Sequence, residues 1–145
     1  MFVKDLKETL NLGKKLSYKL KPQSIVLLQG PIGAGKTSFV QGIAKGLSIS
    51  EDITSPTFAL SHHYKSGRIP LIHLDLYRLE NISSAKEVFF SEEEEAIQRQ
   101  AILVIEWPEL IEKVINNFWK IKINYAKNYG RHYEIRDPKN LLTLS

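Results

Sequence analysis

Hydrophobic positions divide the chain into segments with helical spacing and segments with strand patterns. Apolar residues recur at roughly helical spacing over residues 3–19, which predicts an amphipathic helix ending before Pro22. Short apolar runs at 24–29 and 101–105 each predict a buried strand, because a strand covered on both faces is apolar throughout. Residues 37–47 carry apolar side chains on one face and predict a second helix.

Shorter elements account for the rest of the chain. Strand patterns near 59–64 and over 69–76 flank a turn, and the polar, acidic stretch 81–100 predicts one or two short helices. A short helix is expected to begin at Pro108. Residues 119–125 alternate between apolar and polar, which predicts a half-buried strand, and a turn and a returning strand follow it. We therefore expect residues 1–145 to form a single α/β domain.

Composition narrows the class of protein. A chain of 145 residues is long enough for one domain with a real core, and 43% hydrophobic with 25% charged residues is typical of globular proteins. The absence of cysteine excludes disulfides, a thiolate nucleophile and a cysteine metal site. No apolar run resembles a signal peptide or a membrane span, so we expect a cytoplasmic protein with no membrane partner.

A phosphate-binding motif lies between the first predicted strand and the second predicted helix. The sequence Gly30-Pro31-Ile32-Gly33-Ala34-Gly35-Lys36-Thr37 fits the pattern G-x-x-x-x-G-K-[ST]. In such a loop, backbone N–H groups surround the phosphates of a nucleotide, the lysine reaches the outer phosphates, and the threonine hydroxyl can hold Mg²⁺. The strand, loop and helix order places the phosphates at a helix N-terminus, as the motif requires.

Two carboxylates are candidates for work beside this loop. Asp75 and Glu106 each end an apolar strand, which is where the acid that holds or orients Mg²⁺ normally lies. One could coordinate the metal together with Thr37 and the other could orient the attacking water, and spacing leaves the two roles unassigned. Thr57 follows Pro56 and is either a switch-loop residue near the terminal phosphate or part of a simple turn.

The histidines give no metal signal. His73 alternates with Asp75 and is expected only to fill a polar face of its strand. His62 and His63 lack metal-ligand spacing with a third residue, so no zinc site is predicted.

Charge is unevenly distributed along the chain. Residues 1–21 carry six lysines and two acids, residues 22–112 seven bases and twelve acids, and residues 113–145 seven bases and two acids. Basic ends could contact tRNA, an acidic protein or the nucleotide itself, but no aromatic–basic RNA-binding motif is present. Most of these lysines, and the acidic run 92–95, are expected to be solvated surface.

The chain resembles the TsaE (YjeE) family, small bacterial ATPases required for making threonylcarbamoyladenosine in tRNA. Four segments carry the resemblance, which covers nearly the whole chain: 30–37, 55–58, 73–79 and 104–109. Residues 9–13 and 130–131 match family positions more weakly. Residues 80–100 depart from the family pattern, because they lack its Glu-Leu-rich helix and glycine-containing turn.

The resemblance implies a mixed β-sheet flanked by helices and a site for ATP with Mg²⁺. The residues implied to contact the nucleotide are Thr9, Gly33, Ala34, Gly35, Lys36, Thr37, Ser38, Trp107 and Arg131, with Thr9 and Arg131 near the adenine or ribose. Thr37 and Glu106 would hold Mg²⁺. Catalysis would involve Lys36, Asp75 and a switch-like loop containing Thr57.

The resemblance also implies partners. TsaD transfers the threonylcarbamoyl group, and the ATP cycle of TsaE is thought to reset the TsaD–TsaB complex between turnovers. We therefore expect TsaD and TsaB as protein partners and tRNA as an indirect one, although the sequence alone leaves direct contact with tRNA open.

Two other functions fit the motif alone. A small P-loop kinase is possible, although no arginine cluster forms the lid that such kinases carry, and a GTPase would need an Asn-Lys-x-Asp motif that is absent. A nucleotide-sensing module with negligible turnover is the third hypothesis. A partner-stimulated rate would separate it from an ATPase, because groups supplied in trans can accelerate such sites by roughly 10³–10⁵.

Overall fold

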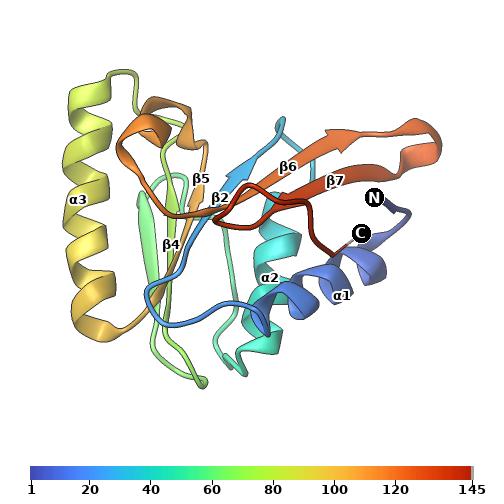
Figure 1. Ribbon diagram of the computed structural model, residues 1–145, viewed down its shortest axis with the longest axis horizontal. Coiled ribbons are helices and arrows are strands. Elements are labelled where there is room, and N and C mark those ends of the chain that lie inside the picture. The colour runs from blue at the N-terminus through green and yellow to red at the C-terminus, as the bar shows by residue number, and fades with distance from the viewer. Residues whose placement is uncertain (145) are drawn as a thin grey trace.

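The computed structural model describes residues 1–144, which form a seven-stranded mixed sheet with helices on both faces (Figure 1). The strand order is β1-β7-β6-β2-β5-β4-β3. The strands are β1 (Phe2–Val3), β2 (Ile25–Gln29), β3 (Ser61–Tyr64), β4 (Leu71–Asp75), β5 (Ile102–Glu106), β6 (Trp119–Tyr125) and β7 (Arg131–Arg136). The helices are α1 (Leu6–Ser17), α2 (Lys36–Gly46) and α3 (Ile82–Arg99). This architecture confirms the predicted mixed sheet flanked by helices.

Four neighbouring strands run parallel at the centre of the sheet. β2 pairs parallel with β5 and β6, and β4 pairs parallel with β5, whereas β3, β7 and β1 join antiparallel at the edges. The register sets Asp75 directly opposite Glu106 and Glu106 opposite Leu28. The carboxyl ends of β2, β4 and β5 therefore meet at one edge of the sheet, where ligands bind in open α/β folds.

Three of the four parallel strands, β2, β4 and β5, are buried on both faces, whereas β6 alternates between buried and exposed residues, as its sequence pattern predicts. Val26 and Leu28 of β2 pack into the core shared with α1 and α2, while the intervening Leu27 packs into the core beneath α3. The continuous apolar runs in β2 and β5 follow from this double burial.

Three short 3₁₀ turns complete the chain: η1 (Pro108–Leu110), η2 (Glu112–Val114) and η3 (Lys127–Tyr129). The short helix expected at Pro108 is η1, with proline at its start. No helix among residues 1–144 is long and apolar enough to cross a membrane.

The N-terminal prediction was too long at both ends. The helix runs over Leu6–Ser17 because the Asp5 side chain caps it, accepting a hydrogen bond from the Glu8 N–H at 2.9 Å. Residues Phe2–Val3 pair instead with β7.

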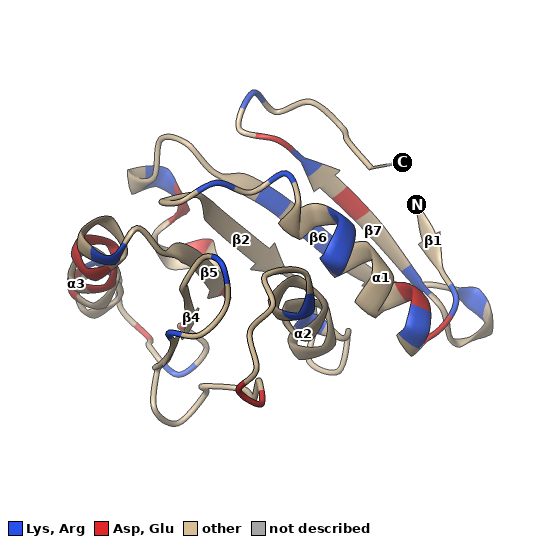
Figure 2. Ribbon diagram, turned by 90° about the horizontal axis from the view of Figure 1, so that it is seen from below, with Lys and Arg blue, Asp and Glu red and all other residues tan. Residues whose placement is uncertain are grey.

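The segment 81–100 is helical, as predicted, but its helix is longer than the one or two short helices expected. It forms the single helix α3 of 18 residues, started by the Asn81 cap, with Ala85, Phe89 and Ala96 buried against the sheet. Its acidic run is not wholly solvated, because Glu92 hydrogen-bonds His63 at 2.7 Å and Ser61 at 3.2 Å on β3. In Figure 2 several stretches of the α3 ribbon are red, the colour of Asp and Glu.

Helices α1 and α2 cross so closely that their glycines are required. A Cβ on Gly42 would lie 2.4 Å from the Leu10 carbonyl oxygen, and one on Gly13 would lie 2.4 Å from that of Phe39. Gly42→Ala is therefore expected to lower the free energy of unfolding by about 1–3 kcal/mol in urea denaturation. Lys45→Ala, on the exposed side of the same helix, should stay within about 0.5 kcal/mol of wild type. Equal stability of the two variants would contradict this, because it would show that α1 and α2 make room for the added methyl group at no cost in free energy.

Candidate functional site

The phosphate-loop motif forms the connection between β2 and α2. Gly33 and Gly35 have φ values of 79° and 97°, a region that glycine adopts without strain. Gly35 is the N-cap of α2, and no side chain within residues 1–144 caps this helix. Backbone N–H groups at the start of α2 are thus left for an anion, which the helix dipole also favours.

A cavity of about 400 Å³ lies over this loop and gathers most of the predicted site. Its walls are Ile32, Gly33, Ala34, Gly35, Lys36, Thr37, Ser38, Ser55, Thr57, Asp75, Tyr77, Glu106 and Trp107. All of these residues except Ser38 fall within the four segments of the family resemblance, and Ser38 directly follows the first of them. The structure places the predicted phosphate, metal and catalytic residues together, and their roles stay predictions.

Lys36 lies against its own loop. Its Nζ donates to the carbonyl oxygens of Gly30 at 2.5 Å and Pro31 at 3.1 Å, and lies 4.1 Å from the centre of the Trp107 ring. Burial lowers the pKa of Lys36, and the negative charges of Glu106 and Asp75 act in the opposite direction. Lys36 is the only lysine or arginine on the cavity wall formed by the described residues. When protonated, its positive charge attracts phosphate to the loop.

The two carboxylates differ in how many of their oxygens are engaged. Asp75 Oδ2 accepts a hydrogen bond from the Thr57 hydroxyl at 2.9 Å, and Asp75 Oδ1 accepts one from the Tyr77 N–H at 2.9 Å. Glu106 is bonded through Oε2 to His73 Nε2 at 2.5 Å, and within residues 1–144 its Oε1 has no such partner. Glu106 therefore keeps one oxygen for a ligand, whereas Asp75 is fixed at both.

His73 is wrongly predicted as a residue of a polar strand face. Its side chain is fully buried, Nε2 lies on Glu106, and Nδ1 has no partner among the described residues. A proton on Nε2 fits both observations, because Nε2 can then donate to Glu106, whereas a proton on Nδ1 would be buried without an acceptor. The position of His73 two residues before Asp75, within a segment of the resemblance, was the signal for this role.

Thr57 belongs to the cavity wall and not only to a turn. Besides its bond to Asp75, its hydroxyl lies 2.7 Å from the Ser55 hydroxyl, while the neighbouring Phe58 is 86% exposed. Thr57 thus joins the loop 55–58 to the carboxylate at the end of β4.

Thr9 and Arg131 lie on a second cavity of about 260 Å³. It adjoins the first, because Gly33, Ala34, Gly35 and Ser38 line both. The position of Thr9 and Arg131 near the adenine or ribose stays a prediction.

Three contacts in the cavity wall and the phosphate loop were not predicted from the sequence. The Tyr77 ring lies tilted against the Trp107 ring with ring centres 4.8 Å apart, Ser55 contacts Thr57, and the Tyr125 hydroxyl donates to the Ile32 carbonyl. Tyr77 and Ser55 fall within segments of the resemblance, whereas nothing in the sequence pattern singles out Tyr125.

Comparison with known proteins places the chain in a family. A family model described as threonylcarbamoyl adenosine biosynthesis protein TsaE matches residues 3–133. The chain is 44% identical over 137 residues to the tRNA threonylcarbamoyladenosine biosynthesis protein TsaE of Nostoc sp., covering 93% of this chain and 83% of that one. It is 44% identical over 112 residues to the TsaE protein of Synechocystis sp., covering 74% and 69%.

A solved structure agrees with these matches. The crystal structure of Bacillus subtilis YdiB superimposes with a TM-score of 0.74 at 28% identity, covering 92% of this chain and 80% of that one. The chain therefore belongs to the TsaE family of proteins of tRNA threonylcarbamoyladenosine biosynthesis.

Proposed function

We propose that this protein is a Mg²⁺-dependent ATPase that acts on the TsaD–TsaB complex during threonylcarbamoyladenosine formation in tRNA. One observation carries the proposal: a phosphate loop with its lysine shares a cavity with two strand-end carboxylates, Asp75 and Glu106. This is the donor set that phosphoryl transfer from a nucleotide uses.

The residues present fit Mg²⁺. Its preferred ligands are hard oxygens, and it usually keeps several waters while binding one or two protein groups and the substrate phosphates. The Thr37 side chain and the unengaged Oε1 of Glu106 meet this need on one cavity wall. When bound, Mg²⁺ neutralises charge on the phosphate oxygens. His73 holds Glu106 in place through its other oxygen.

Asp75 is the candidate for orienting the attacking water. Its oxygens are held by Thr57 and by the Tyr77 N–H, which fixes the carboxylate plane. A carboxylate has about four lone-pair sites, so two of them remain for water. Thr57 connects the same carboxylate to the loop 55–58, so movement of this loop and the position of Asp75 are coupled.

ATP is the proposed nucleotide, with the phosphates on the loop and the adenosine toward Thr9 in the adjoining cavity. Hydrolysis by this chain alone is expected to be slow, with partner groups completing the site. Contact with tRNA is proposed to be indirect, and the protein to be cytoplasmic, where tRNA is modified.

Co-purification with tagged TsaD–TsaB tests the partner. We expect the chain to be retained by the complex, and the amount retained to change between ATP with Mg²⁺ and no nucleotide. Lys36→Ala should lose the nucleotide effect, because it lacks the charge that faces the phosphates. Absence of retention in every nucleotide state would contradict the proposed partnership.

A further inference from the structure

The β6–β7 hairpin contacts the phosphate loop from the side. The Tyr125 hydroxyl, at the end of β6, donates to the Ile32 carbonyl. Arg131, at the start of β7, donates from Nη2 to the Gly33 carbonyl and from Nε to the Ala34 carbonyl, each at 3.2 Å. Three successive loop carbonyls are thus held by two side chains of one hairpin.

Arg131 is itself fixed. Its Nη1 donates to the carbonyls of Tyr129 at 2.9 Å and Gly130 at 3.0 Å, and its guanidinium carbon lies 4.8 Å from the centre of the Tyr125 ring. An arginine offers five N–H donors, and these four hydrogen bonds use all but one of them. The side chain is therefore committed to the protein backbone.

The hairpin that carries Tyr125 and Arg131 is itself held by regular strand pairing. β6 and β7 pair over six registered residue pairs from Lys120↔Arg136 to Tyr125↔Arg131. The N-terminal residue also hydrogen-bonds to β7. The Tyr133 N–H donates to the Met1 carbonyl at 2.8 Å, and the Met1 amino group donates to the Tyr133 carbonyl at 3.0 Å.

Holding the carbonyls also orients the N–H groups. In a planar trans peptide, C=O and N–H point in opposite directions. The N–H groups of Gly33 and Gly35 belong to the peptides whose carbonyls, on Ile32 and Ala34, bond to the hairpin. They therefore face away from the hairpin, on a loop whose glycines would otherwise sample many conformations.

We propose that Tyr125 and Arg131, together called the hairpin clamp, are positioning residues that hold the phosphate loop in its anion-binding conformation before a nucleotide arrives. The clamp rests on the proposed function of the loop. It lowers the conformational entropy lost on binding, which raises phosphate affinity without contacting the nucleotide. Arg131 therefore has a role different from the adenine or ribose contact that the family resemblance implied.

The test compares ATP with inorganic tripolyphosphate, both without Mg²⁺, by calorimetric titration. Tyr125→Phe deletes one hydroxyl and should weaken both ligands by about 3- to 10-fold, the effect of one hydrogen bond. Arg131→Ala should weaken both by about 10- to 100-fold, since it removes two loop contacts. The two ligands should lose affinity by the same factor, because the clamp acts on the loop.

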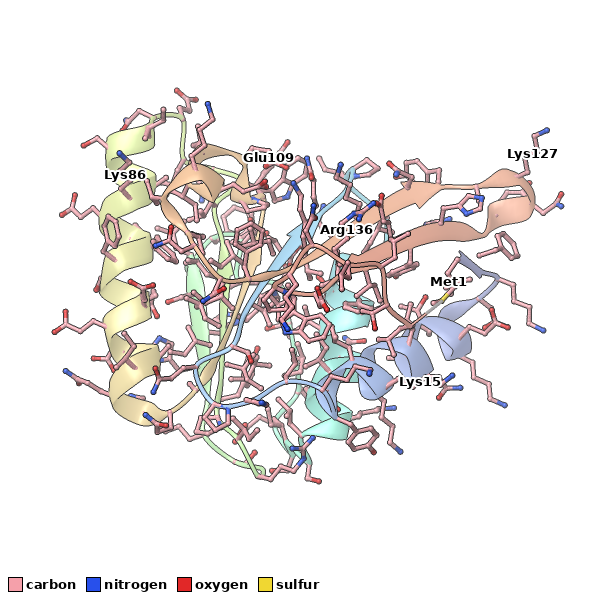
Figure 3. The ribbon with its side chains drawn as sticks, in the orientation of Figure 1. Met1, Lys15, Lys86, Glu109, Lys127 and Arg136 are labelled. Carbon is pink, nitrogen blue, oxygen red and sulfur yellow. The ribbon has the colours of Figure 1, made fainter. Side chains whose placement is uncertain are left out.

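A matched control removes a charge without touching the loop. Lys127 lies at the exposed tip of the same hairpin and points away from the sheet (Figure 3). Lys127→Ala should bind both ligands like wild type. A variant of Arg131 that loses ATP affinity but keeps tripolyphosphate affinity would overturn the clamp and favour direct contact with the adenosine.

Hydrogen exchange of the ligand-free protein supplies a second readout. Amides of residues 33–37 should exchange faster in Tyr125→Phe and Arg131→Ala than in wild type, with those of β5 unchanged. Equal loop exchange in all variants would overturn the clamp. Wild-type protein that binds neither ligand would overturn the proposed function instead, and loop exchange would still decide the clamp.

Discussion

Lys36→Ala is expected to lower ATP hydrolysis by about 10²–10³-fold, the usual effect of removing one preorganised charge-stabilising group from a site of this kind. Lys36 is the only cation on the described cavity wall, and its Nζ lies at the loop where the outer phosphates are expected. Phosphate release and ATP titration measure the change. Unchanged hydrolysis would contradict the ATPase proposal.

Loss of folding is not expected to explain the effect of Lys36→Ala. Burial disfavours the charged form of this lysine and lowers its pKa, which offsets part of the cost of losing its hydrogen bonds to the Gly30 and Pro31 carbonyls. The variant should therefore stay folded and show a cooperative urea transition. Lys45→Ala, on the exposed side of the same helix, is the matched control and should keep wild-type hydrolysis.

Glu106→Gln is expected to abolish the effect of Mg²⁺ on ATP binding. The amide keeps an oxygen that can accept from His73 Nε2 while losing the negative charge that Mg²⁺ requires. ATP affinity in EDTA should change little, whereas the gain on adding Mg²⁺ should disappear and hydrolysis should fall by about 10²-fold or more. Titration of ATP with and without Mg²⁺ measures both effects.

Two further variants separate charge from structure. Glu109→Gln removes an exposed carboxylate that also raises the pKa of Lys36, and should keep the Mg²⁺ effect. Glu106→Ala should additionally lower the free energy of unfolding by about 1–3 kcal/mol, because it leaves the buried His73 donor without its acceptor. If Glu106→Gln weakened binding equally with and without Mg²⁺, Glu106 would not be the metal ligand.

The loop and its flanking elements could be predicted from the sequence because their determinants are local. The apolar run of β2, the glycine pattern and the helical spacing of α2 lie within 23 consecutive positions, residues 24–46. Asp75 and Glu106 could each be placed at a strand end. That they lie side by side depends on the parallel register of β4 and β5, which no local pattern encodes.

The parts that escaped prediction depend on distant contacts. β1 has only two residues, too few to show alternation, and exists because β7 pairs with it. The bond from Tyr125 to Ile32 joins residues 93 positions apart, and the bond from His73 to Glu106 joins residues 33 apart. Only the folded sheet shows which oxygen of each carboxylate is engaged, and this is the observation on which the proposed assignment of Mg²⁺ to Glu106 rests.

Phosphate release from ATP and Mg²⁺, measured for this protein alone and with TsaD–TsaB, tests the central claim most directly. We expect slow release by the wild-type protein alone, faster release with the complex, and release at the level of the complex alone when Lys36→Ala replaces wild type. Release that is the same for wild type and Lys36→Ala, with the complex present, would contradict the claim that the loop 30–37 of this protein hydrolyses ATP.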